Sequence, residues 1–75
     1  SRTTIREKLL TYLAHQARAA GSQTFTVPIS RTALAEYLCA DRAAMTRELA
    51  RMKEEGLVDY DKRTFTLYAE NTGAP

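Results

Sequence analysis

The feature that most constrains the fold is a pair of short amphipathic segments with only three residues between them. Residues 31–38 and 42–55 both carry apolar side chains at intervals of three and four, the spacing of one helical face. Ser30 and Asp41 stand immediately before the two segments, and their side-chain oxygens suit the free amides at a helix start. Two helices joined by residues 39–41 must turn sharply and pack together, as in a helix-turn-helix. The apolar face of the first segment is expected to comprise Ala33, Leu34, Tyr37 and Leu38.

A longer amphipathic segment precedes this pair. Residues 4–20 predict a helix, because their apolar side chains form one stripe: Ile5, Leu9, Leu10, Tyr12, Leu13 and Ala17. Thr4 and Glu7 have the capping-box spacing, which satisfies two free amides at a helix start. Gly21 is placed to end this helix in a left-handed cap, and Gly56 is placed to stop the helix over residues 42–55.

Two regions alternate polar and apolar residues with the period of a β-strand. Residues 23–29 predict one brief edge strand followed by a turn, since Pro28 cannot donate a hydrogen bond to a neighbouring strand. Residues 57–67 predict a β-hairpin with residues 61–63 between its strands, although no Asn-Gly pair marks the turn.

The order of these elements indicates one fold class: mainly α with a small β-wing (α+β), the winged helix-turn-helix. Seventy-five residues suffice for one small domain, so residues 1–75 are expected to form a single domain with an ordered part over about 4–68. Residues 71–75 are expected to be a frayed end. A core of this size seldom has room for a buried cleft, which favours a binding module over an enzyme.

The residues that could carry catalysis or bind a metal are too few or wrongly placed. Cys39 and His15 are each alone of their kind, so a zinc ligand set is not met, and Cys39 is expected to be a turn or core residue. Glu54 and Glu55 are adjacent on a helix and therefore diverge, which is wrong for paired acid–base work. We predict no enzymatic activity, no metal site and no cofactor in this domain. No long apolar run or leader pattern occurs, so we expect no membrane segment and a cytoplasmic location.

The segment over residues 42–55 has two unlike faces when about 100° is allowed per residue. One face carries the apolar residues Met45, Leu49 and Met52, and the opposite face carries Ala43, Arg47 and Ala50, flanked by Thr46 and Arg51. Small alanines let a helix backbone approach a DNA groove closely. A guanidinium such as that of Arg47 can donate two hydrogen bonds to guanine O6 and N7. Arg42, in the first turn, can reach either a base or a phosphate.

Two other interpretations of this face remain open. The arginines could form an ordinary solvated surface and pair with nearby carboxylates; the residues concerned are Arg42, Arg47 and Arg51 with Glu48, Glu54 and Glu55. Alternatively, the domain could be a winged-helix module that docks a partner protein and binds no DNA. That function would need an apolar patch around Ala43 and Arg47, and the sequence has none there.

The stretch ISRTALAEYLCADRAAMTRELARMKEEGLVDYDKRTFTLY resembles the C-terminal DNA-binding domain of the CRP/FNR family of bacterial transcription regulators. The residues that carry the resemblance are Arg31, Leu34 and Ala35 in the first helix of the pair, then Arg42, Arg47 and Leu49, and the closing Glu-Glu-Gly-Leu-Val over residues 54–58. The opening IREKLLTYL also resembles the helix that precedes this unit in the family, so the resemblance covers about residues 4–68. Ala43 departs from the family's frequent glutamate, and Cys39 replaces its common turn glycine.

The resemblance implies sequence-specific binding of double-stranded DNA, with the helix over residues 42–55 in the major groove. Together with the helical geometry, it leads us to expect base-reading roles for Arg42, Ala43, Thr46 and Arg47. Phosphate-binding roles are expected for Ser30, Arg31, Thr32, Arg51, Lys62 and Arg63, the last two from the wing.

The family also implies parts that this chain does not contain, namely an N-terminal effector-sensing β-barrel and a long dimerisation helix. We therefore expect the chain to be the C-terminal piece of a longer protein that binds a pseudo-palindromic operator as a homodimer. RNA polymerase is a further candidate partner of such a protein. The effector of the sensor domain is not encoded in these residues.

Overall fold

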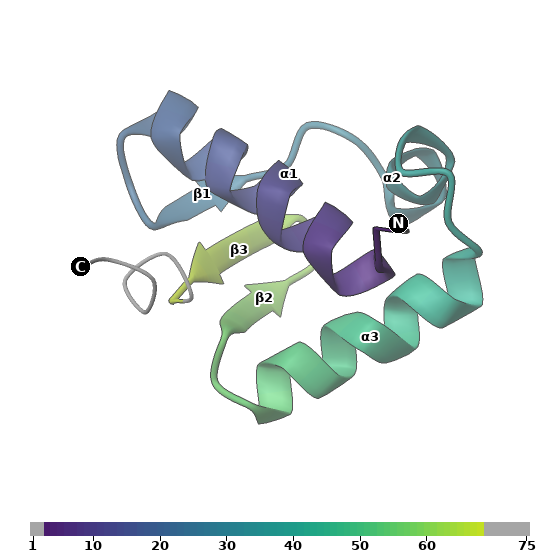
Figure 1. The fold of residues 1–75 in the computed structure, drawn as a ribbon. Helices are drawn as coiled ribbons and strands as arrows, with labels where there is room; N and C mark the ends of the chain where they lie inside the picture. The colour runs from purple at the N-terminus through teal and green to yellow at the C-terminus, as the bar shows by residue number, and fades with distance from the viewer. Residues whose placement is uncertain (1–2, 69–75) are drawn as a thin grey trace.

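The computed structural model describes residues 3–68, which form three helices and a small antiparallel sheet (Figure 1). In chain order the elements are α1 (Ile5–Ala20), β1 (Thr24–Thr26), α2 (Arg31–Tyr37), α3 (Arg42–Glu54), β2 (Val58–Asp61) and β3 (Thr64–Leu67). The predicted fold class is confirmed: α2 and α3 form the helix-turn-helix, and β2 and β3 form the wing. The end predicted to fray, residues 71–75, lies outside the described residues.

The helices begin at the residues whose side chains suit the role. The capping box is complete, since the Glu7 amide donates to Thr4 Oγ1 at 3.1 Å and the Thr4 amide donates to Glu7 Oε1 at 2.9 Å. Ser30 and Asp41 each accept a hydrogen bond from the amide three residues on, at 3.2 and 2.9 Å. These local contacts set where α1, α2 and α3 start.

Each of the three helices is followed, within two residues, by a residue in the left-handed conformation. Gly21, Cys39 and Gly56 have φ of 67°, 55° and 78°. The amides of Cys39 and Ala40 donate to carbonyls within α2 at 3.1 and 2.9 Å, which reverses the chain directly after that helix. Because Cys39 carries a Cβ atom, it adopts this conformation at a steric cost that glycine does not have.

The sheet has the strand order β1-β3-β2, so the predicted edge strand pairs with the far strand of the hairpin. Both pairings are antiparallel, with Phe25 opposite Phe65 and Tyr60 also opposite Phe65. On the outer face, the hydroxyls of Thr24 and Thr66 lie 2.9 Å apart. The edge strand ends at residue 26, before Pro28.

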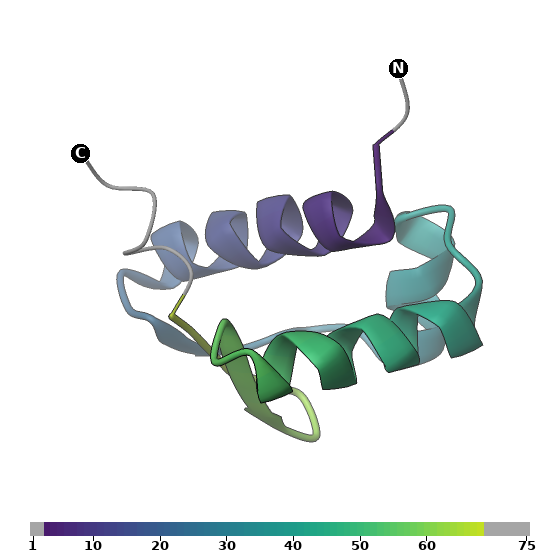
Figure 2. The ribbon, with the colours of Figure 1, turned by 60° about the horizontal axis from the view of Figure 1, so that its bottom comes forward.

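The core lies between the helices and one face of the sheet (Figure 2). Every element contributes to it, and its buried members are Leu9, Leu13, Ala17, Phe25, Val27, Leu34, Ala35, Leu38, Met45, Leu49, Met52, Val58, Phe65 and Leu67. The predicted inward face of α3 is confirmed, because Met45, Leu49 and Met52 are at most 1% exposed. This packing fixes which side of α3 is left for solvent.

Several element boundaries differ from the sequence prediction by one to three residues. The helices α2 and α3 end one residue early, at Tyr37 and Glu54, because the following residue acts as the C-cap. The strand predicted over residues 23–29 is limited to three residues, and the hairpin starts at Val58.

The prediction that Tyr37 lies on the apolar face of α2 is wrong, because its side chain is 69% exposed. The core is contacted instead by Leu34, Ala35 and Leu38, which occupy one arc of this short helix. Tyr37 lies at the border of that arc. Its ring and that of Tyr12 on α1 are packed edge to face at a centroid distance of 5.7 Å.

Candidate nucleic-acid interface

The outward side of α3 presents small and basic side chains. Ala43, Thr46, Arg47 and Ala50 are all exposed, and Arg42 in the first turn is exposed as well. Within residues 3–68, neither Arg42 nor Arg47 has an ion-pair or hydrogen-bond partner through its side chain. Two guanidinium groups therefore project into solvent beside a backbone that is covered only by short side chains.

Arg51 differs from these two arginines because it is paired. Its Nη2 atom lies 2.5 Å from Glu48 Oε1, one helical turn earlier. The Glu48 side chain is only 13% exposed, and it also accepts a hydrogen bond from Arg6 Nε of α1. The interpretation in which all three arginines pair with carboxylates therefore holds for Arg51 alone among the described residues.

Arg6 links α1 to two carboxylates, Glu48 on α3 and Glu55 directly after it. It contacts Glu48, and its two terminal nitrogens donate to the Glu55 carboxylate at 2.8 and 3.0 Å. Hydrogen bonds from Arg51 and Arg6 lower the pKa of the Glu48 carboxyl, and those from Arg6 lower the pKa of the Glu55 carboxyl. Both carboxylates are thus held in the charged form by arginines.

The start of α2 holds three residues predicted to bind phosphate. Ser30 Oγ already accepts a hydrogen bond from the Ala33 amide, and Thr32 is exposed. Arg31 turns toward the wing, where its Nη2 donates to the Lys62 carbonyl at 2.7 Å. Arg31 thus differs from Thr32, because one of its guanidinium nitrogens already donates to the wing.

The wing turn consists of Lys62 and Arg63, and both are exposed. The backbone of Lys62 has a φ of 57°, a value that residues other than glycine rarely adopt. Arg63 is fixed to the connection before α2, because its carbonyl accepts from the Val27 amide at 2.8 Å and its Nη1 donates to the Pro28 carbonyl at 3.3 Å. The turn extends beyond α3, on the side away from α1 (Figure 2).

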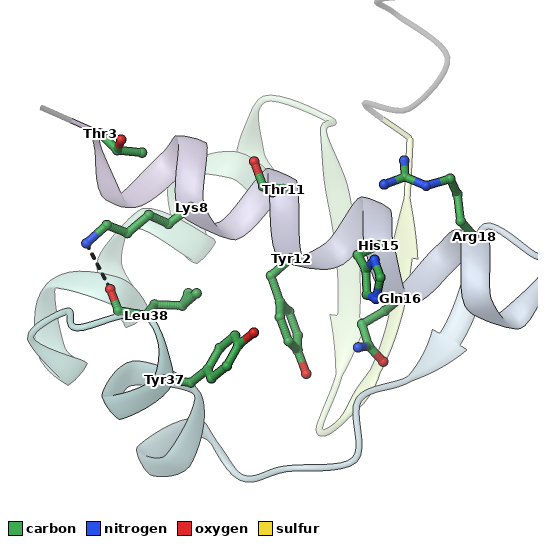
Figure 3. Close-up of a pocket in the computed structure, with 9 residues that line it drawn as sticks. All are labelled: Thr3, Lys8, Thr11, Tyr12, His15, Gln16, Arg18, Tyr37 and Leu38. Atoms are coloured by element: carbon green, nitrogen blue, oxygen red, sulfur yellow. Dashed lines mark hydrogen bonds between the residues drawn. The ribbon is translucent and has the colours of Figure 1, made fainter. Parts of the chain in front are cut away.

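A recess on the surface between α1 and α2 lies apart from this face. Its volume is about 580 Å³, and its lining includes no residue of α3 or of the wing (Figure 3). Lys8 crosses one end and donates to the Leu38 carbonyl at 2.8 Å. His15 stands toward the other end and is exposed.

The described part of the chain shows neither a cluster of metal-binding side chains nor a membrane-spanning helix. Among residues 3–68, no three side chains of the kinds that bind metal ions are grouped together. Over the same residues, no helix combines the length and apolar character needed to cross a bilayer. The thiol of Cys39 is exposed in the turn between α2 and α3.

Sequence reasoning missed two sets of contacts. The network of Arg6 with Glu48 and Glu55 joins residues 42 and 49 positions apart, and the contact of Arg31 with Lys62 spans 31 positions. No local pattern signals such pairs, because they depend on how helices and strands are placed in space.

Comparison with known proteins adds two similarities. Residues 7–70 match the family of Crp-like helix-turn-helix domains. A protein of Lacticaseibacillus casei described as a probable transcriptional regulator, flp, is 39% identical over 68 residues, which make up 89% of this chain and 31% of that relative. The chain thus spans about a third of the length of the relative.

Proposed function

Because the chain belongs to the Crp-like helix-turn-helix domain family, we propose that it binds double-stranded DNA as part of a bacterial transcription regulator. In this proposal α3 lies in the major groove and α2 braces it. The observation that carries the proposal is the outward face of α3, where Arg42 and Arg47 project without internal partners among the described residues. Ala43 and Ala50 leave that face slim enough to enter a groove.

The proposed roles follow the position of each side chain. Base edges are read by Arg42, Ala43, Thr46 and Arg47 on α3. Phosphates are contacted by Ser30, Thr32, Arg51, Lys62 and Arg63, and Arg51 must exchange its Glu48 partner for a phosphate oxygen to do so. The family resemblance assigns Arg31 to a phosphate as well, but its contacts with the wing favour a role within the protein.

The whole protein is proposed to bind a pseudo-palindromic operator as a homodimer, with one copy of α3 in each half-site. Such readers engage half-sites about 34–36 Å apart. A regulator that binds bacterial DNA acts in the cytoplasm, and RNA polymerase is a further candidate partner. The matched relative is about three times as long as the aligned segment, and the effector-sensing domain that the family resemblance implies is proposed for a longer protein of that kind.

The rival function, docking of a partner protein through the same face, lacks a supporting patch. Among the described residues, the large apolar side chains that are exposed are Tyr37 and Tyr68, and neither lies on α3. A basic face with small side chains favours a polyanion over an apolar protein surface.

The proposal is tested by measuring binding of the 75-residue chain to duplexes selected from a random pool, over a series of salt concentrations. We expect the logarithm of the affinity to fall linearly with the logarithm of salt, by about 0.9 per phosphate contacted. Arg47→Ala should cost about 1–3 kcal/mol of binding free energy and relax the preference at one base pair.

The matched control is Arg18→Ala, which removes the same charge from the exposed side of α1. It should change the affinity only slightly and leave the sequence preference intact. An equal loss for both variants would mean that the protein senses net charge alone. No duplex binding at low salt would leave the docking function as the better description.

A further inference from the structure

Arg31 links the helix-turn-helix to the wing through its side chain. It is the first residue of α2, and its Nη2 donates to the Lys62 carbonyl at 2.7 Å. Its Cζ atom lies 4.7 Å from the centroid of the Phe65 ring and 5.4 Å from that of Tyr60. The guanidinium thus contacts both strands of the hairpin and the turn between them.

The surroundings of Arg31 suit a structural contact better than a phosphate contact. A planar guanidinium is weakly hydrated and stacks on aromatic rings, so it can be partly buried without losing its charge. Burial lowers the pKa of Arg31 from its ordinary value, consistent with a group partly removed from water. By contrast, Lys62 and Arg63 at the turn are exposed.

Contacts from outside the hairpin hold the turn. The strands β2 and β3 have four residues each, β1 pairs with β3 alone, and the turn residue Lys62 has a φ of 57°. Arg63 is tied to the β1–α2 connection by the Val27 amide and by its own bond to the Pro28 carbonyl. Arg31 supplies the corresponding tie for Lys62.

We propose that Arg31 is a positioning residue for the wing: it holds the Lys62–Arg63 turn so that these two side chains meet the DNA backbone beside α3. The inference rests on the proposed function, because it concerns how the DNA-binding surface is assembled. It replaces the phosphate role that the family resemblance implies for Arg31.

The first test is a double-mutant cycle on duplex affinity. Arg31→Ala is compared in the unchanged protein and in a Lys62→Ala/Arg63→Ala background, at fixed low salt. If Arg31 acts through the wing, its removal weakens binding about tenfold in the unchanged protein and less than twofold in that background. The same loss in both backgrounds, with a salt slope lowered by about 0.9 each time, would identify a direct phosphate contact and overturn the proposal.

The second test needs no DNA and follows amide hydrogen exchange in the free 75-residue chain. Arg31→Ala should speed exchange of the Val27 amide, whose acceptor is the Arg63 carbonyl, while the Leu49 amide in α3 keeps its rate. Arg31→Lys retains a cation but not the planar stack, so it should restore the Val27 rate only in part.

These two measurements separate the failure of this proposal from that of DNA binding. If the chain ignores duplex DNA but Val27 exchange responds to Arg31, the proposed function fails and the positioning contact stands. If Val27 exchange is the same in both Arg31 variants as in the unchanged protein, Arg31 does not position the wing, whatever the DNA affinity.

Discussion

At the scale of single residues, the basic side chains of this domain fall into groups with different surroundings. Arg42 and Arg47 face solvent, Arg51 is paired with Glu48 on its own helix, and Arg31 lies on the aromatic rings of the wing. Arginine side chains therefore have three different surroundings in this small domain: solvent, a carboxylate and aromatic rings. Which group an arginine belongs to determines what its removal does to folding and to binding.

Glu48 provides a prediction about stability and pH. Glu48→Gln removes the carboxylate shared by Arg6 and Arg51, and we expect its midpoint of thermal unfolding at pH 7 to fall by several degrees. The pKa of Glu48 is lower in the folded protein than in the unfolded chain, so the stabilisation is fully present above the unfolded value of about 4.3. It is lost as the pH falls through the folded value. Thermal unfolding followed by circular dichroism from pH 7 to pH 3 measures both effects.

The control for this prediction is Glu54→Gln, which neutralises an exposed carboxylate on the same helix. It should leave the unfolding midpoint nearly unchanged at pH 7. If the unchanged protein and Glu48→Gln differ by a constant amount down to pH 3, the carboxylate charge is not what stabilises α1 against α3.

At the scale of elements, the helix ends determine the geometry of the helix-turn-helix. Each helix begins at a side-chain cap and is followed within two residues by a residue in the left-handed conformation. At two of these ends the residue is glycine, and between α2 and α3 it is Cys39. Of the three turns that follow the helices, the one between α2 and α3 therefore carries the backbone strain.

Cys39→Gly tests this strain. We expect it to raise the free energy of unfolding by about 0.5–1 kcal/mol, because relief of the left-handed penalty exceeds the added flexibility of glycine. A change of that size moves the unfolding midpoint of a small domain upward by about 2–8 °C, which thermal denaturation resolves.

Two comparison variants make the interpretation specific. Cys39→Ala keeps a Cβ atom and should leave stability close to that of the unchanged protein. Gly56→Ala introduces the same strain after α3, where no atom beyond Gly56 and its two chain neighbours lies within 4 Å of the added Cβ. It should lower the unfolding free energy by about 1 kcal/mol. Stabilisation by Cys39→Ala as large as by Cys39→Gly would point to the thiol and not to the backbone.

At the scale of the whole molecule, the domain is small enough for two copies to lie side by side on one face of a duplex. Its principal extents are 30 × 28 × 22 Å. Neighbouring copies would then have centres about 30 Å apart or slightly more, which is close to the separation of about 34–36 Å between half-sites one helical turn apart. The dimensions are thus compatible with the proposed dimeric reader.

This fit predicts how two tethered copies should bind. Joining two chains by a flexible linker should raise the affinity for an inverted repeat by about 10²–10⁴-fold over one copy, because the second contact becomes intramolecular. Inserting five base pairs between the half-sites rotates them to opposite sides of the duplex and should remove most of the gain. Competition binding on the two duplexes measures this, and equal affinities for both would contradict the side-by-side arrangement.

The sequence by itself determined the features that depend on neighbours a few positions away. The apolar stripe of α3, the caps at Thr4, Ser30 and Asp41, and the hairpin were all predictable, because their signals recur within one or two turns of chain. The outward position of Arg47 followed from the same periodicity. Local periodicity therefore predicts both the fold class and the outward face of α3.

Only the tertiary structure decided which distant side chains meet. The network around Arg6 and the contact of Arg31 with the wing join segments far apart in the chain. The strand order and the exposure of Tyr37 likewise depend on how distant elements are placed. Such contacts depend on the angles and directions at which whole elements pack, and local periodicity does not encode them. For that reason the candidate interface was foreseeable on α3, whereas the contact of Arg31 with the wing is visible only in the tertiary structure.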